Sequence, residues 1–304
     1  MWSRCACLFL AGVSVAAAQV SNAGALERGL RFFSEGRFAE AEPSLREAVA
    51  AQPRSFDARL ALGATLAQLK RPAEAIQQLQ EAHRLRPGHV DALKLLAAQY
   101  MIERQYGKAV ALLAPVTDAD EEVYLLLIES YQASSDTARS FALAQKAVLR
   151  FPSSPQVNCW MGFQLQFSGR YEEARGYLEK AIRLAPEYPA TYYLLADVLL
   201  KQQKARESIP YFEKAVELDA NDMEARMGLS QAWSASGDLA KALAVLEAAE
   251  KASPEDARVH LLLSRLWFRL GDEPRAQQEA DLSLKYRNPG GAGPALPTAL
   301  RSDR

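Results

Sequence analysis

Few residues in this sequence have the types and spacing that a chemical site requires. The histidines are His83, His89 and His260; the first two stand close together, and the third lies far along the chain. Zinc sites place their ligands at short, fixed spacings such as H-E-x-x-H or C-x-x-C, and neither pattern occurs. The sequence therefore predicts no metal ligands and no bound cofactor.

The cysteines do not indicate a reactive thiol. Cys5 and Cys7 fall in an apolar leader, so Cys159 is the single cysteine in the rest of the chain. A lone cysteine cannot form an internal disulfide, and buried free cysteines usually behave as small apolar residues. We therefore interpret Cys159 as a packing residue on a helix face.

Other kinds of catalysis have equally little support. Carboxylates such as Glu172 and Glu173 have the spacing of a solvated helix face, and Gly290-Gly291 follows no strand, unlike a phosphate-binding loop. The formal net charge is −1 and the pI is near 6.4, so no basic excess draws the chain to nucleic acid. We expect no catalytic residues and hence no enzyme.

The elements that would position any site are helical. Residues 155–188 read as two helices around a short break, and Ala174, Leu178 and Ala181 recur on one face of the second at intervals of three or four. Pro186 ends that second helix, because proline has no N–H to donate and clashes with the preceding turn. The unit is a helical hairpin that fills positions 155–188.

The spacing of prolines indicates that this unit is repeated along the chain. Pro53 and Pro87 stand one unit length apart, as do Pro152 and Pro186, while Pro254 follows Pro186 after two unit lengths. The interval from Pro87 to Pro152 is three positions short of two unit lengths, so two units fit there with a small deletion. A fixed period in this range predicts a stack of repeats.

Residues 155–188 resemble one tetratricopeptide repeat. The family's pattern asks for a small residue, a bulky one, Ala, a large apolar residue, Ala and Pro, and the sequence supplies Gly162, Leu165, Ala174, Leu178, Ala181 and Pro186. The resemblance implies an all-α fold, a right-handed α-solenoid of about eight tandem helix-turn-helix repeats over residues 22–288. The repeats are expected near 22–55, 56–89, 90–120, 121–154, 155–188, 189–222, 223–256 and 257–288.

Two repeats depart from the pattern. In the third, Pro115 arrives early and shortens the second helix. In the fourth, Ile128 occupies the small slot, Ser140 replaces Ala and Ala144 replaces the large residue, which suggests a large-for-small exchange between facing positions.

The two ends of the chain differ from the array. Residues 1–18 read as a signal peptide, with Arg4, a short apolar run and three alanines that would leave Gln19 as the new N-terminus. We therefore expect export to the periplasm or outside the cell, with no membrane span after cleavage. Residues 289–304 are rich in Gly, Pro and Ala and are expected to form a flexible tail.

The resemblance also implies a binding surface, because first helices of the family line a concave groove that holds a peptide or a partner helix. The residues in its slots include Met101, Glu129, Gln132, Phe163, Gln166, Phe167, Tyr193, Asp197, Lys201, Arg265, Phe268 and Arg269. We expect exposed aromatic rings among them to anchor a protein partner and the last arginines to attract an acidic segment. Lys94 occupies a slot of the family's carboxylate clamp, but Ala98 stands where the clamp needs asparagine, so no clamp is expected.

Three functions remain open from the sequence. The first is an exported, non-catalytic scaffold that binds a protein or peptide in its groove. The second is a structural subunit of a bacterial envelope assembly or secretion machine. The third is an RNA-binding helical repeat, which the acidic balance and the regular proline-ended period argue against.

Overall fold

The part of the chain that the computed structural model describes, residues 23–116 and 119–287, forms sixteen α-helices and no strand. This confirms the all-α repeat architecture, and each of the eight intervals expected from the sequence holds one pair of helices. The expected signal peptide at 1–18 and tail at 289–304 lie outside the described residues. The chain divides within α9, after Leu143, into two compact units.

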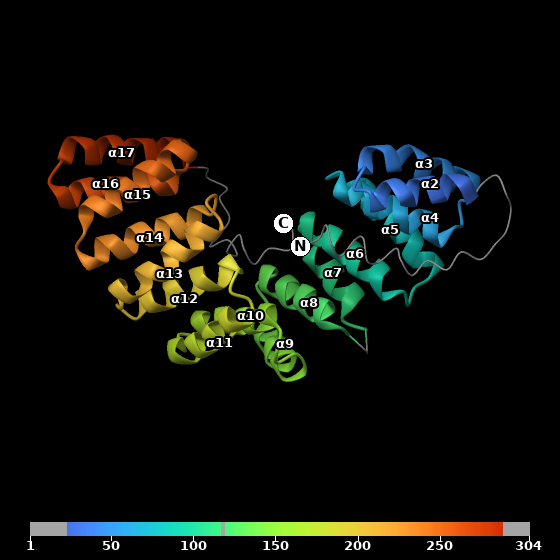
Figure 1. Ribbon diagram of the computed structural model, residues 1–304, viewed down its shortest axis with the longest axis horizontal. Helices are drawn as coiled ribbons and strands as arrows, with labels where there is room; N and C mark the ends of the chain where they lie inside the picture. Colours follow the sequence, from blue (N-terminus) through green and yellow to red (C-terminus); the bar gives the residue numbers. More distant parts are fainter. Residues whose placement is uncertain (1–22, 117–118, 288–304) are drawn as a thin grey trace. The chain divides into compact units, whose positions relative to one another are not determined.

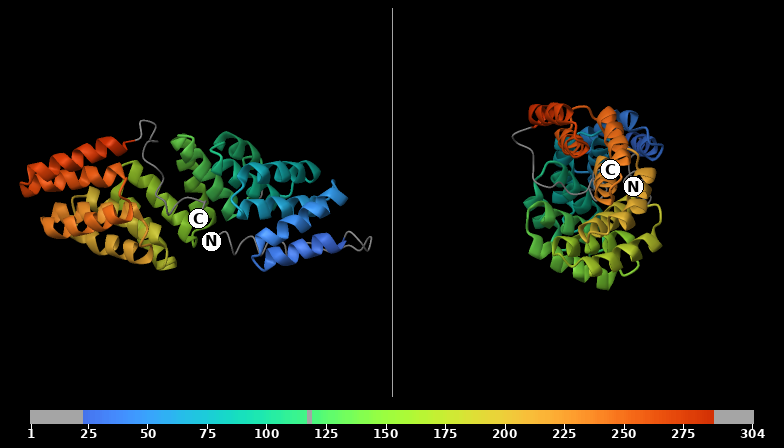
Figure 2. Two further views of the ribbon diagram at one scale, coloured as in Figure 1. Left: turned by 90° about the horizontal axis from the view of Figure 1, so that it is seen from above. Right: turned by 90° about the vertical axis from the view of Figure 1, so that its left-hand side faces the viewer.

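The helices of each unit stack as hairpins in chain order (Figures 1 and 2). The first unit contains α2 (Ala23–Ser34), α3 (Phe38–Ala51), α4 (Phe56–Gln68), α5 (Pro72–Leu85), α6 (Val90–Ile102), α7 (Tyr106–Leu113) and α8 (Glu121–Ala133), and α9 (Thr137–Arg150) spans the division. The second contains α10 (Pro155–Phe167), α11 (Tyr171–Leu184), α12 (Pro189–Lys201), α13 (Ala205–Leu218), α14 (Met223–Ser236), α15 (Leu239–Ala252), α16 (Ala257–Leu270) and α17 (Glu273–Tyr286).

Local signals in the sequence explain where the helices begin and end. Ser154 accepts a hydrogen bond from the N–H of Val157 at 3.1 Å, and Asp222 likewise caps α14. Such caps satisfy N–H groups that the first turn of a helix cannot pair internally. Shortly beyond the ends of α5 and α11 stand Pro87 and Pro186, which cannot continue a helix.

In every repeat, the fifteenth residue lies in the turn between the two helices and has a left-handed backbone conformation. Glycine occupies this position in four repeats, as Gly36, Gly169, Gly237 and Gly271. In the other four the residues are Lys70, Arg104, Ser135 and Gln203, with φ between 55° and 64°. Glycine adopts this conformation without the strain that a Cβ atom introduces. The break read in the sequence is therefore one repeated turn geometry.

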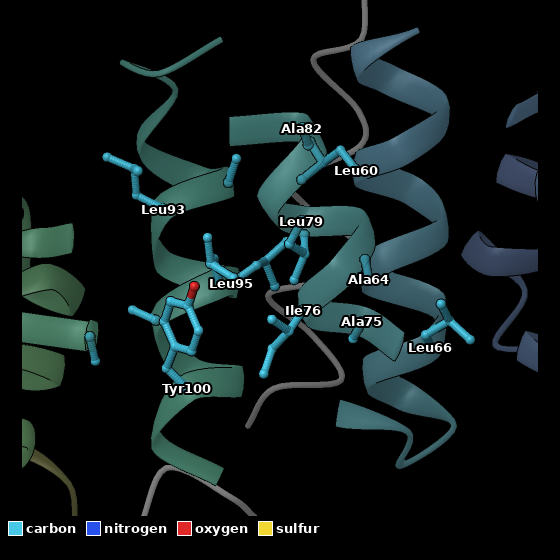
Figure 3. Close-up of a cluster of buried hydrophobic side chains, with 14 of the residues drawn as sticks. Leu60, Ala64, Leu66, Ala75, Ile76, Leu79, Ala82, Leu93, Leu95 and Tyr100 are labelled. Atoms are coloured by element: carbon cyan, nitrogen blue, oxygen red, sulfur yellow. The ribbon is translucent and has the colours of Figure 1, made fainter. Parts of the chain in front are cut away.

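The small residue of the first helix lies where the second helix crosses it. A Cβ atom added at Gly162 would lie 2.5 Å from Cγ of Leu178, and one at Gly63 would lie 2.7 Å from Cγ of Leu79. Figure 3 shows Leu79 of α5 among the side chains of α4 and α6, including Leu60. The absence of a side chain thus lets the two backbones approach closely.

Where serine replaces the small residue, its hydroxyl group bonds to the facing helix. Ser230 donates to the carbonyl oxygen of Ala242 at 2.9 Å, and Ser264 donates to that of Ala276 at 2.8 Å. In the fourth repeat Ser140 is on the second helix and donates to the carbonyl oxygen of Ile128 at 2.9 Å. The exchange at this crossing thus includes a hydrogen bond that the sequence pattern did not predict.

Candidate functional site

Of the four aromatic residues of the expected groove, two pack against their neighbours and two are exposed, Phe167 and Phe268. Phe163 is only 3% exposed, with its ring edge-on to Trp160 and Phe167 at centroid distances of 5.5 and 4.8 Å. The expectation that Phe163 is an exposed anchor is wrong, because the neighbouring rings of α10 cover it, whereas Phe167 itself is exposed. Tyr193 is half-buried and packs edge-on against Phe212 of α13, and burial raises the pKa of its phenol group.

Amide and charged residues of the same surface bind one another. The buried Gln166 of α10 donates to the carboxylate of Asp197 on α12, which also accepts from Nζ of Lys201 at 2.6 Å. Further along, Arg258 pairs with Glu224, so it links α16 to α14. These side chains tie successive first helices together, a role that slot positions alone did not reveal.

Three expected groove residues lie in the first unit and are largely covered. Met101 at the end of α6 is 6% exposed, and Glu129 on α8 is also buried. Gln132, one turn further along α8, is half-buried. The expectation of an open side chain is therefore wrong for Glu129 and for Met101, which packs in the core of that unit.

The ammonium group of Lys94 forms ion pairs with three carboxylates of its own chain. Its Nζ lies 2.9 Å from Asp120 and from Glu122, and 3.5 Å from Asp91. Although burial opposes it, hydrogen bonding to Glu122 and Asp120 raises the pKa of Lys94 above its usual value. This ammonium group links α6 to the start of α8 past the short α7, so it is not available for a partner's carboxylate.

Cys159 is fully buried in α10, and desolvation by burial raises the pKa of its thiol to about 12. A thiol with so high a pKa is not a nucleophile at neutral pH. The interpretation of Cys159 as a packing residue is confirmed.

An open hollow of about 770 Å³ lies on the last hairpin, and here the expected residues do come together. Arg265, Phe268 and Arg269 of α16 line it with Ala276 and Ala280 of α17. The ring of Phe268 is 67% exposed. Arg269 hydrogen-bonds to the carbonyl oxygen of Ser234 at 3.1 Å, whereas no ion pair forms at Arg265 within the described residues.

A comparison of the repeats shows that a large side chain is missing at the hollow. The twenty-fourth residue carries a large side chain in six of them, as Leu45, Leu79, Leu113, Leu178, Phe212 and Leu246, and each is buried. In the fourth repeat this position is Ala144, where the small slot holds the large Ile128 instead. In the last repeat it is Ala280, which lines the hollow beside the small Ser264. The missing side chain could have been found from the sequence by comparing this position across repeats.

Within residues 23–116 and 119–287, no helix combines the length and the hydrophobicity of a transmembrane segment. The same residues contain one cluster of possible metal ligands, formed by Glu250, His260 and Glu279. The sequence did not suggest it, because the three residues come from three helices and fit no short motif.

Comparisons with known proteins agree with this architecture. Three family models described as tetratricopeptide repeat match residues 26–90, 153–221, and 199–266 with 234–288. Those three leave the region between residues 90 and 153 unmatched, where the third and fourth repeats depart from the pattern.

Curated relatives are similar over part of their length. The chain is 27% identical to human "Protein O-mannosyl-transferase TMTC1" over 167 residues, which is 52% of this chain and 19% of that protein. It is 26% identical to "Bacteriophage adsorption protein A" of Escherichia coli (strain K12) over 215 residues, 70% of this chain and 22% of that protein. The chain thus spans about a fifth of the length of these two relatives.

Solved structures share the fold. In the "APC/C hetero-tetramer Cut9-Hcn1", the similar chain has a TM-score of 0.65 at 14% identity, covering 93% of this chain and 56% of that one. "MamA 41-end from Desulfovibrio magneticus RS-1" has a TM-score of 0.50 at 20% identity, and the likeness covers 55% of this chain and 96% of that one. At these identities the likeness concerns the fold alone. The matched family models and the repeated helical hairpins show that the chain belongs to the tetratricopeptide repeat family.

Proposed function

We propose that this protein is a non-catalytic scaffold that binds a protein partner at the hollow of its last hairpin. The observation that carries the proposal is Ala280, which stands where six other repeats bury a large side chain. The resulting hollow has an apolar floor at Ala276 and Ala280 and an exposed ring at its rim, Phe268. Exposed aromatic side chains beside an apolar pocket are typical of the anchor points of protein interfaces.

The charges at the hollow define the partner further. Arg265 and Arg269 contribute two positive charges to its lining, and Glu273 contributes one negative charge. The partner therefore presents an apolar side chain to the floor and acidic groups to the arginines. Charge complementarity of this kind mainly raises the rate of association, whereas the buried apolar contact supplies most of the affinity.

Site-specific crosslinking in cells tests this function. We expect a photoreactive amino acid at Phe268 to capture a protein, since that ring is exposed at the rim. The matched control is the same amino acid at Leu284, which is 66% exposed on α17 but does not line the hollow. Equal capture from both positions would contradict a partner site at the hollow.

A second variant fills the hollow from within. Ala280→Leu restores the large residue, and repeat seven shows that leucine fits there opposite serine, as Leu246 and Ser230 are both buried. We expect the crosslink from Phe268 to disappear in this variant while the helical content stays unchanged. Persistence of the crosslink in a folded Ala280→Leu protein would show that the partner binds elsewhere.

We also propose that the scaffold acts after export. The support is the sequence of residues 1–18, with Arg4 before a short apolar run and three alanines at its end. We expect N-terminal sequencing of the mature protein to begin at Gln19 or within a few residues of it. An intact Met1 on the mature protein would refute export by cleavage.

A further inference from the structure

We propose that Glu250, His260 and Glu279 form a binding site for a zinc ion at the end of the array. They come from α15, α16 and α17, and one ligand atom of each lies within 4.8 Å of the others. Imidazole nitrogen and carboxylate oxygen are ligands that Zn²⁺ accepts. The proposal depends on which imidazole nitrogen carries a proton.

Comparison between repeats assigns that proton. The fourth residue of a repeat donates to the carbonyl six residues earlier: Arg59 to Pro53 at 3.0 Å, Asn158 to Pro152 at 3.0 Å, and Arg226 to Ala220 at 2.6 Å. His260 occupies the same position, and its Nε2 lies 2.8 Å from the carbonyl oxygen of Pro254. A carbonyl oxygen can only accept a hydrogen bond, as it does from Arg59, Asn158 and Arg226. Nε2 of His260 is therefore the nitrogen that carries the proton.

This assignment leaves Nδ1 facing a carboxylate. Nδ1 of His260 lies 2.7 Å from Oε2 of Glu279. In neutral imidazole with a proton on Nε2, Nδ1 is an acceptor, and two acceptors at this distance repel unless a cation lies between them. A proton or a metal ion satisfies the pair. A backbone carbonyl that accepts from the other ring nitrogen is one of the partners that orient metal-binding histidines.

The charges favour a divalent ion over a proton. Both Glu250 and Glu279 face the imidazole, and neither pairs with a lysine or arginine within the described part of the chain. A proton on His260 offsets one of these two negative charges, whereas Zn²⁺ offsets both. The second repeat shows the contrast: at the same two positions Arg59, with a fixed charge, bonds to the neutral amide of Gln78.

The surroundings restrict the histidine and leave access from the carboxylate side. His260 is 1% exposed and its ring stacks on Tyr286, with a centroid distance of 5.5 Å and an interplanar angle of 27°. Glu250 and Glu279 are partly exposed, so water can complete the coordination from that side. Zinc ligands sit at about 2.0–2.2 Å from the ion, so Nδ1 and Oε2 must separate by roughly half an ångström on binding.

A proton is the competitor of zinc at this site. Although burial opposes it, hydrogen bonding to Glu279 and to the Pro254 carbonyl raises the pKa of His260 above its usual value. A proton on Nδ1 must leave before a metal ion can bind to this nitrogen. We expect zinc affinity to rise with pH as this proton leaves.

Calorimetric titration of ZnCl₂ into the metal-free full chain tests the site, in two buffers that differ in ionisation enthalpy. We expect one zinc ion per chain with release of about one proton. His260→Asn removes the Nδ1 ligand but keeps a donor for the Pro254 carbonyl oxygen, as Asn158 is for Pro152 in the fifth repeat. This variant, Glu250→Gln and Glu279→Gln should each weaken binding by about tenfold or more, whereas the control His83→Gln should not.

Thermal unfolding in zinc gives an independent readout, because an ion that binds the folded state stabilises it. We expect zinc to raise the melting temperature of wild type and of His83→Gln, and not that of His260→Asn. Absence of saturable binding to the wild type, or unchanged binding in His260→Asn, would overturn the proposal. Either result would assign the space between Nδ1 and Glu279 to a proton alone.

Discussion

Gly162→Leu should lower the free energy of unfolding of the protein by about 1–3 kcal/mol. A Cβ at this residue would lie 2.5 Å from Cγ and 2.7 Å from Cδ2 of Leu178, and 3.3 Å from the carbonyl oxygen of Ala174. Leu178 is fully buried, so its side chain has little room to move aside, and the larger residue must push the helices apart. Urea denaturation followed by circular dichroism measures the change.

Gly176→Leu is the matched control. Gly176 lies in α11 of the same repeat, is exposed, and would present its Cβ to open space. Leucine has a higher helix propensity than glycine, so this variant should be neutral or slightly more stable than wild type. If both variants have the same stability, or if Gly162→Leu is the more stable, the crossing at Gly162 does not control packing.

Lys94→Met should also destabilise the protein strongly, because it leaves Asp91, Asp120 and Glu122 together without their shared cation. Removing one partner of a buried ion pair typically costs about 3–5 kcal/mol. Asp120 is half exposed, so solvent screens part of the repulsion, and we expect about 1–3 kcal/mol. The control Lys108→Met removes an exposed ammonium group that bonds to the neutral Gln105 and lies over the ring of Tyr100, and it should change stability much less.

The pH dependence separates this ion cluster from a simple loss of packing. Although burial opposes it, the hydrogen bond from Lys94 lowers the pKa of Asp120 in the folded protein. A carboxyl group with a lowered pKa stabilises the fold above its unfolded value, about 3.9, and loses that contribution as pH falls through the folded value. The difference between wild type and Lys94→Met should therefore shrink below about pH 4. A constant difference from neutral to acidic pH would show that packing, not charge, explains the effect.

The helical hairpin and its period can be predicted from short stretches of the sequence. Prolines such as Pro186 end helices through their own covalent structure, and a spacing of three or four places Ala174 and Leu178 on one face whatever lies around them. Gly162 could be placed at the crossing because its partner Leu178 belongs to the same repeat. These features depend on short stretches of chain, so the sequence contains the information needed to predict them.

Which side chains remain exposed depends on how the helices pack, and the sequence did not reveal it. The slot of Phe163 is the same whether its ring is free or covered, and the structure covers it with Trp160 and Phe167. Lys94 and Asp120 belong to different helical hairpins, and only the packing of α6 beside the start of α8 brings them into contact. Exposure depends on every neighbour in space, whereas a repeat pattern records only positions along one helix.

The zinc site proposed at the last repeats likewise depends on packing that the sequence did not reveal. Each of Glu250, His260 and Glu279 is an ordinary residue of its own helix in the sequence, well separated from the other two along the chain. Stacking of α15, α16 and α17 brings their ligand atoms within 4.8 Å. Secondary structure follows from local spacing, but a site built from three helices exists only once those helices are packed, because packing alone sets distances between residues far apart in the chain.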